Sequence, residues 1–170
     1  LQGELSVLNL PTDRPRPPVQ TFKGAIAKLV LPQTLRQELK DLSRQQGVTL
    51  FMTLLTAFKI LLYRYTGQTD IIVGSPIANR NKAEIEQLIG FFVNVLVLRT
   101  ELSDGLSFQE LLTRVKSTAL EAYVHQDLPF EKLVEELQPN RDLSYNPLFQ
   151  VMFVLQNVPI PNLDLPDVSV

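Results

Sequence analysis

One stretch in the middle of the chain, residues 91–101, constrains the possible folds more than any other. Its alternating positions place Phe91, Val93, Val95 and Val97 on one face and Phe92, Asn94, Leu96 and Leu98 on the other. Both faces are therefore apolar, and Asn94 is the one polar residue among them. A strand with two apolar faces is typical of a buried position in a sheet that carries helices. The sequence therefore predicts a central strand over residues 91–101.

The amide of Asn94 needs an explanation within such a strand. A buried amide without hydrogen-bond partners costs ~1–3 kcal/mol. Two interpretations follow. Either neighbouring backbone groups bind the Asn94 side chain, or the side chain faces a cavity through which substrate amides pass.

The periodicity of apolar residues predicts the elements around this strand. Spacings of three and four residues indicate helices over 32–46, from residue 50 onward after a Thr49 cap, over 82–88, over 107–123 and over 129–138. Further strands are expected over 24–31, 70–77 and 149–156. In the helix after Thr49, a narrow stripe of Thr56, Lys59 and Tyr63 is polar, so we expect the rest of its surface to be largely buried. This order predicts a mixed α/β (α+β) fold with helices on a central sheet.

The two ends of the chain differ from this core. Residues 1–20 are expected to form an extended connector, because four prolines fix the backbone and remove donors: Pro11, Pro15, Pro17 and Pro18. Residues 21–170 form the second unit, in which 139–147 is a loop and 159–166 is irregular. The chain begins with Leu1 rather than Met and ends on apolar residues, which favours a piece of a longer polypeptide.

Composition excludes several classes of function. The net charge of −2 offers no basic field for nucleic acid or an anionic membrane. The absence of cysteine excludes disulfides, a thiol nucleophile and a thiolate metal site, and a single histidine excludes a histidine-cluster metal site. No apolar run reaches the ~18 residues of a membrane span. A cytoplasmic protein is expected.

Common catalytic motifs are missing from the sequence. Ser75 follows Gly74, but Pro76 would distort a nucleophile elbow, so a turn serine is favoured. His125 and Asp127 precede Pro129 at a helix boundary. The favoured interpretation is that Asp127 caps the helix over 129–138 and His125 binds backbone. Arg80 is most simply a charge on a solvated loop.

Five stretches together resemble the condensation domains of nonribosomal peptide synthetases. The connector from Gly3 to Pro17 is similar to the segment that leads into the second lobe of that domain, and residues 74–80 are also common in the family. Residues 89–99 resemble the fifth core motif of the family, residues 125–131 the sixth and residues 141–150 the seventh. In the seventh motif, Tyr145 stands where arginine is frequent.

The resemblance implies a fold with two lobes, and it assigns the catalytic motif to the first of them. Members of the family pair two chloramphenicol-acetyltransferase-like lobes in a V with a tunnel between them. This chain is then most of the C-terminal lobe, over residues 21–170, preceded by the connector between the lobes. The catalytic His-His-x-x-x-Asp-Gly motif belongs to the first lobe, and this sequence contains no such string. No catalytic residue and no metal are therefore expected here, and His125 is not given that role.

The implied chemistry is amide-forming acyl transfer between two tethered thioesters. One carrier protein presents an acyl or peptidyl group, another presents an aminoacyl group, and the free amine attacks the donor carbonyl. Holding the two reactants together supplies much of the catalysis. No cofactor is expected to bind directly, because partner carrier proteins supply the phosphopantetheine arm. Expected partners are the N-terminal lobe, upstream and downstream peptidyl carrier proteins and an adenylation domain, with no nucleic acid and no membrane.

The resemblance also assigns positions to individual residues. Asn94, with Ser75, is expected at the substrate tunnel. Expected lobe-junction or structural residues are Arg80, His125, Asp127, Arg141 and Asp142. Arg80 resembles an arginine that pairs with the aspartate of the catalytic motif, although a surface-loop charge is an equal alternative. Arg141 and Asp142 are expected to order their loop.

Two other functions stay open at this point. One keeps the fold and changes the chemistry to epimerisation or heterocyclisation, although the string from Asn146 to Gln150 favours ordinary condensation. The other is a non-catalytic platform that docks carrier proteins or a neighbouring domain.

Overall fold

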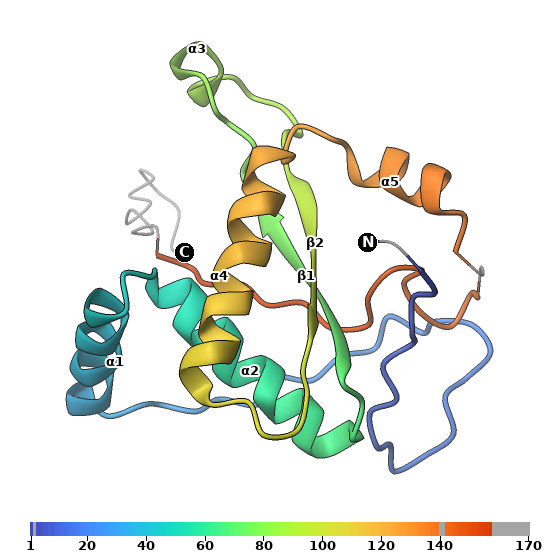
Figure 1. The fold of residues 1–170 in the computed structure, drawn as a ribbon. Helices are drawn as coiled ribbons and strands as arrows, with labels where there is room; N and C mark the ends of the chain where they lie inside the picture. Colours follow the sequence, from blue (N-terminus) through green and yellow to red (C-terminus); the bar gives the residue numbers. More distant parts are fainter. Residues whose placement is uncertain (2, 140–141, 158–170) are drawn as a thin grey trace, which may run out of the picture.

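The computed structural model describes residues 1, 3–139 and 142–157 as a mixed α/β structure (Figure 1). Its elements are, in chain order, α1 (Gln33–Gln45), α2 (Leu50–Thr66), β1 (Asp70–Ile77), α3 (Ala83–Glu86), β2 (Asn94–Glu101), α4 (Phe108–Val124) and α5 (Phe130–Leu137). Each helix expected from the apolar periodicity is present, with ends close to those expected. The predicted fold class is confirmed.

Local capping explains where the two long helices begin and end. At the start of α2, the Oγ1 atom of Thr49 accepts a hydrogen bond from Met52 N, and the helix ends at Gly67, whose φ of 68° favours glycine. At the start of α4, Ser107 and Glu110 form a reciprocal capping box. These contacts satisfy backbone donors that have no partner inside the helix.

The sheet is built around β1. Strand β2 pairs with it in antiparallel register from Asp70↔Glu101 to Ile77↔Asn94. On the other side of β1, Gly74 N donates to Val151 O at 3.0 Å and Phe153 N donates to Gly74 O at 2.9 Å. These two bonds form a parallel bridge between Gly74 and Met152. Within the described residues, β1 thus pairs with the antiparallel strand β2 on one side and forms a single parallel bridge on the other.

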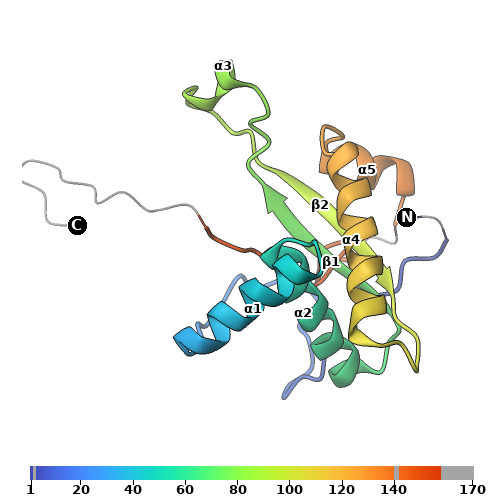
Figure 2. The same ribbon diagram turned by 60° about the vertical axis from the view of Figure 1, so that its left-hand side comes forward.

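The predicted central position of the 91–101 strand was wrong. Strand β2 begins at Asn94 and, within the described residues, pairs with β1 alone. The strand starts late because its last partner is Ile77, and residues 78–93 leave the sheet as an excursion that carries α3 (Figures 1 and 2). Both faces of β2 are nevertheless apolar, because a separate hydrophobic cluster covers each of them.

The two clusters lie on opposite faces of the sheet. The larger one joins β1 and β2 to α2 and α4 and includes Leu55, Val73, Leu98 and Val115. The smaller one contains Ile72, Val97, Leu148 and Phe149, with residues of α5 packed against it. Alternate residues of β2 therefore enter different clusters, as the alternation of side chains along a strand requires.

Two other predicted strands do not form in the described structure. Residues 24–31 carry no secondary structure and are exposed, because no neighbouring strand offers them backbone partners. The strand expected over 149–156 is reduced to the single bridge at Met152. The tail at 159–166, which was expected to be irregular, lies outside the described residues.

Residues 5–10 are held to the body of the chain. Leu8 is buried in the larger cluster, and its backbone N–H donates to the side chain of Gln150 at 2.7 Å. Leu10 packs against the same cluster and Leu5 against the smaller one. The proline-rich residues that follow, 11–18, are exposed and have no secondary structure apart from bends. The role of this stretch as a connector between lobes stays a prediction.

The helices of the described residues are too short or too polar to cross a membrane one at a time. Helices α1 and α2 reach the necessary length and composition when they are taken as one pair, but the pair is bent by 106°.

Candidate functional site

The side chain of Asn94 joins the start of β2 to the loop before α5. Its Nδ2 atom donates to the carbonyl oxygens of Gln126 and Leu128, at 2.8 Å each. Its Oδ1 atom accepts a hydrogen bond from Phe130 N at 3.0 Å. The amide is only 7% exposed. Of the two interpretations of Asn94, backbone binding is therefore the one that these contacts show. We call this set of three hydrogen bonds the Asn94 clamp.

The clamp also determines how α5 begins. Pro129 occupies the N-cap position and offers no side-chain acceptor. The Oδ1 atom of Asn94, which belongs to β2, acts as the acceptor instead, because it binds the N–H of the first helical residue. The predicted capping of this helix by Asp127 was wrong. Asp127 instead accepts a hydrogen bond from Asn81 Nδ2 at 3.2 Å, so it ties the same loop to the chain beyond β1.

Arg80 closes the excursion between the two strands. Its guanidinium donates to the carbonyl oxygens of Ile85, Glu86 and Gly90. It also lies over the ring of Phe92, with 4.2 Å between the guanidinium carbon and the ring centre. Arg80 is thus more than a solvated loop charge. Its pairing with an aspartate of another lobe stays a prediction.

Ser75 and Asn94 come together on one face of the sheet. Ser75 pairs with Leu96, and Asn94 pairs with Ile77 two positions along. Directly paired residues share a face, so the side chains of Ser75 and Asn94 lie on the same side. Ser75 is buried inside β1 rather than placed in a turn, which corrects the expected turn serine. The position of both residues beside a substrate tunnel stays a prediction.

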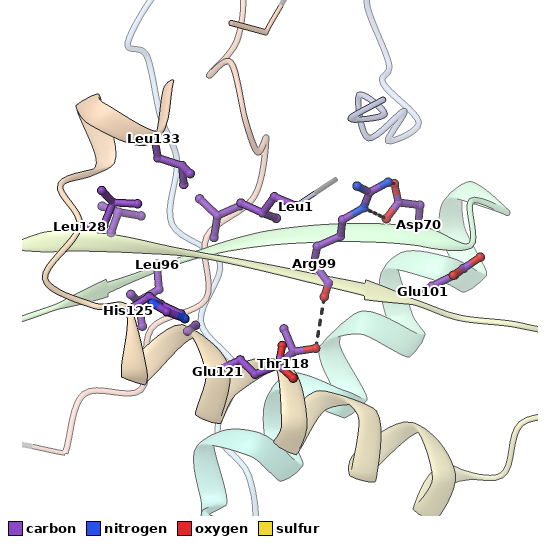
Figure 3. Close-up of a pocket in the computed structure, with 13 residues that line it drawn as sticks. Leu1, Asp70, Leu96, Arg99, Glu101, Thr118, Glu121, His125, Leu128 and Leu133 are labelled. Atoms are coloured by element: carbon purple, nitrogen blue, oxygen red, sulfur yellow. Dashed lines mark hydrogen bonds and ion pairs between the residues drawn. The ribbon is translucent and has the colours of Figure 1, made fainter. Parts of the chain in front are cut away.

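A cavity of about 610 Å³ lies beside β2, between α4 and α5 (Figure 3). Its apolar walls come from Val95 and Val97 of β2 and from Leu133 of α5. At one end, Arg99 forms a two-bonded ion pair with Asp70, at 2.8 and 2.9 Å. That ion pair raises the pKa of Arg99. Because the charge of Arg99 is matched by Asp70, this end of the cavity is polar but not strongly cationic.

His125 is exposed at the end of α4 and lines this cavity. Its backbone carbonyl accepts a hydrogen bond from Leu128 N at 3.1 Å, which helps to form the loop before α5. Within the described residues, its ring makes no hydrogen bond. A contact between the ring and the backbone was expected and is therefore not found.

The remaining two site residues belong to the loop before Leu148. Arg141 lies outside the described residues. Asp142 accepts a hydrogen bond from Ser144 N at 2.7 Å, and hydrogen bonding to Ser144 holds the pKa of that carboxyl below its ordinary value. The bond closes a short turn of the chain.

One polar residue was missed by the sequence reasoning. Lys59 was placed on a polar stripe of its helix, yet it is 0% exposed and lies under the sheet. Its Nζ atom donates to Leu98 O at 2.7 Å, to Thr100 Oγ1 at 2.8 Å and to Ile71 O at 3.3 Å. Burial lowers the pKa of Lys59 to about 7, against a smaller opposing effect of Asp70. The lysine thus joins α2 to both strands.

The signal for this burial was present in the pattern of α2. Thr56, in the same stripe, is also fully buried, whereas Leu61 and Tyr65 of the apolar surface are about half exposed or more. The stripe therefore faces the sheet, and part of the apolar surface faces outward. A lone lysine inside a nearly apolar helix could have been read as a buried donor.

Comparison with known proteins places these features in a family. The family model described as Condensation domain matches residues 1–167. A linear gramicidin synthase of Brevibacillus parabrevis is 62% identical over 160 residues, which are 94% of this chain and 3% of that protein. Malpibaldin synthetase of Mortierella alpina is 50% identical over 163 residues, which are 96% of this chain and 3% of that protein. The chain thus spans a small part of the length of such relatives.

Two solved structures are similar over most of the chain. One is a four-domain nonribosomal peptide synthetase bound to AMP and glycine, with a TM-score of 0.88, 26% identity, and coverage of 91% of this chain and 12% of that one. The other is a complex of the X-domain and OxyB from teicoplanin biosynthesis, with a TM-score of 0.80, 30% identity, and coverage of 89% and 33%.

Proposed function

The chain belongs to the condensation-domain family of nonribosomal peptide synthetases, and from this premise we propose that it is one lobe of an amide-forming acyltransferase. The observation that carries the proposal is the family match over residues 1–167, because it includes every motif stretch in the sequence. The geometry supports it. The Asn94 clamp joins residues 89–99 to residues 125–131, and the Asn81–Asp127 bond ties residues 125–131 to the residue that follows the stretch 74–80.

In the proposed reaction, the amine of a carrier-bound aminoacyl group attacks the carbonyl of a carrier-bound acyl or peptidyl thioester. A C–N bond forms and the C–S bond breaks. The amine proton is lost, and the leaving sulfur is protonated on the phosphopantetheine arm of the donor carrier. The chain itself supplies no acid or base, because the family's two-histidine motif is missing from it. Its part is to form one wall of the tunnel and to orient the two arms.

The proposed partners follow from this role. They are the N-terminal lobe of the same domain, an upstream and a downstream carrier protein, and an adenylation domain in the same polypeptide. The phosphopantetheine arms belong to the carriers, so this lobe holds no cofactor of its own. Asn94 and Ser75 are proposed to lie near the tunnel, with Asn94 acting through the loop that it holds.

Peptide formation from two loaded carriers tests the proposal. We expect the 170-residue chain alone to give no product above the carrier-only background, and a longer polypeptide that contains both lobes to give product. Turnover by the 170-residue chain would show that the lobe is catalytic by itself. A folded two-lobe polypeptide that binds both carriers without forming product would contradict the acyltransferase role.

A second candidate function is a non-catalytic docking platform. The structure of the X-domain with OxyB favours it, because a similar lobe there occurs in a complex with another protein. The same assay separates the two functions. Binding of a neighbouring domain or carrier without product, in a polypeptide whose first lobe lacks the two-histidine motif, would support the platform.

A further inference from the structure

The core of the chain contains a lysine that the proposed function does not use. Lys59 lies in α2 and is 0% exposed. Two of the residues that it binds through their carbonyl oxygens, Ile71 and Leu98, belong to the larger hydrophobic cluster. An ammonium group in such a place is costly unless an anion pairs with it. The charge state of this amine therefore affects how firmly α2 packs on the sheet.

The two strands bring no anion into contact with Lys59. The charged group that acts on it is Asp70 of β1, which forms no ion pair with it. Both carboxylate oxygens of Asp70 bind Arg99 instead, at 2.8 and 2.9 Å. In β2, Lys59 binds Thr100, and the side chains of Arg99 and Glu101 point to the opposite face of the sheet because side chains alternate along a strand.

The helices around Lys59 bring no anion to it either, as far as the structure describes the chain. On α2, Tyr63 lies one turn further along, and its hydroxyl hydrogen-bonds to Asp104. The buried residue of α1 is Ser43, whose hydroxyl binds Thr53. The residues that α4 contributes to the larger cluster are all apolar: Leu111, Leu112, Val115 and Ala119. Among the described residues, an ammonium group at Lys59 would have no counter-ion.

The hydrogen-bond partners of the amine match a neutral group. Nζ lies 2.7 Å from Leu98 O, 3.3 Å from Ile71 O and 2.8 Å from Thr100 Oγ1. Thr100 is only 4% exposed, and within the described residues its hydroxyl has no other partner. A neutral amine has two hydrogens for the two carbonyls and a lone pair for the hydroxyl hydrogen of Thr100. An ammonium group has three donors and no acceptor, so it would leave that buried hydrogen unbonded.

We propose that Lys59 is a neutral amine in the folded chain, and that its protonation in the neutral pH range loosens α2 from β1 and β2. The junction of Lys59, Thr100 and the two carbonyls is then a pH-sensitive switch in the fold. Burial lowers the pKa of Lys59 to about 7, which agrees with this range. A lysine exposed by opening of the core stays charged throughout the range. The open state therefore becomes more populated as the pH falls.

The NMR chemical shift of the Lys59 Cε atom tests the charge state directly, because this carbon is bonded to the amine. The measurement uses the longer polypeptide with ¹³C-labelled lysine and assigns the resonance through bonds from the Lys59 backbone, so it needs no variant. We expect the resonance to move from the position of a neutral amine to that of an ammonium as the pH falls from about 9 to about 6. A resonance that stays at either position over this range would overturn the proposal.

Hydrogen exchange of backbone amides in the middle of α2 tests the consequence for packing. After correction for the intrinsic pH dependence of exchange, we expect the open state to be about tenfold more populated at about pH 6 than at about pH 8. Lys59→Met is the matched control, because it lacks the amine and should not show this change. An equal change in both proteins would assign it to another titrating group and overturn the proposal. No substrate is present, so failure of the acyltransferase assay leaves this result unaffected.

Discussion

At the scale of single residues, buried polar side chains connect the sheet to helices and loops. Asn94 and Lys59 each bind three groups that belong to other parts of the chain. A buried polar group costs free energy unless it is bonded, and a bonded one specifies which elements meet. Both residues interrupt apolar patterns, and both hold the sheet to helices or loops.

Replacement of Asn94 by alanine should lower stability. The change leaves two carbonyl oxygens and the N–H of Phe130 without their partner, which should cost on the order of 1–3 kcal/mol. Thermal unfolding of the two-lobe domain checks the expected fall in melting temperature. Asn94→Asp is the matched control, because it keeps an acceptor for Phe130 N and loses both donors. If Asn94→Ala melts like the parent and forms product several-fold more slowly, Asn94 acts on substrate rather than on the loop.

The stability should depend on pH through Lys59. Burial lowers its folded-state pKa to about 7 from 10.5, so between these pH values the unfolded chain binds the proton and the folded chain does not. The free energy of unfolding therefore rises with pH in this window and levels off on either side of it. The slope contributed by this group is at most ~1.4 kcal/mol per pH unit.

Denaturant unfolding of the parent and of Lys59→Met at pH 6 to 10 measures this contribution as a difference between the two proteins. The methionine variant retains the unbranched stem and lacks the amine. We expect the parent to gain stability relative to the variant as the pH rises. A difference that stays constant over this range would show that Lys59 keeps its proton in the folded state.

At the scale of elements, β1 is the strand on which the molecule is assembled. It pairs with β2 on one side and with residues 151–153 on the other, and hydrophobic clusters cover both of its faces. Gly74 lies at its centre, where the ring of Phe149 approaches the backbone closely. A Cβ atom at Gly74 would lie 2.6 Å from that ring. The close approach requires glycine at this position.

Gly74→Ala should therefore destabilise the chain, because the Phe149 ring must move and it also packs on Phe130, with ring centres 5.6 Å apart. Overpacking of this kind typically costs ~1–3 kcal/mol. Gly24→Ala is the control, since a Cβ there would meet no atom within 4 Å. Chemical denaturation of both variants checks the difference. Equal stabilities would show that Phe149 finds another position at little cost.

At the scale of the whole molecule, large apolar side chains are exposed at several places among the described residues. They include residues 22–31, the α3 excursion with Ile89 and Phe91, and the outer face at Met152 and Val154. Large exposed apolar patches mark surfaces that bind another part or partner. This exposure supports the proposal that the chain is one lobe of a longer domain.

We expect the 170-residue chain to bind a hydrophobic fluorescent dye strongly and to self-associate, because these patches have no cover. Fluorescence titration and sedimentation measure both effects, with the two-lobe polypeptide as the comparison. The longer polypeptide should bind less dye per molecule. A monomeric 170-residue chain with no dye binding would show that these residues pack on one another in solution.

The sequence by itself determined the features that depend on near neighbours along the chain. Helix positions, the Thr49 cap and the Ser107–Glu110 capping box follow from residues within a few positions of one another. The span of β1 and the fold class followed from the apolar pattern in the same way. The motif stretches also led from sequence to family, since their order and spacing are linear properties.

Only the tertiary structure decided which residues meet across the chain. The pattern of β2 indicates that both of its faces are covered, but it could not show whether a strand lies on each of its edges, because edge neighbours bind the backbone and not the side chains. Lys59 could not be placed from its helix alone, since its acceptors are 12 to 41 residues away. For the same reason, the sequence favoured Asp127 as the cap of α5, whereas in the structure Asn94 of β2 provides the acceptor. Residues 24–31 have the pattern of a strand, but a strand also needs a neighbour, and that neighbour is set by the fold as a whole.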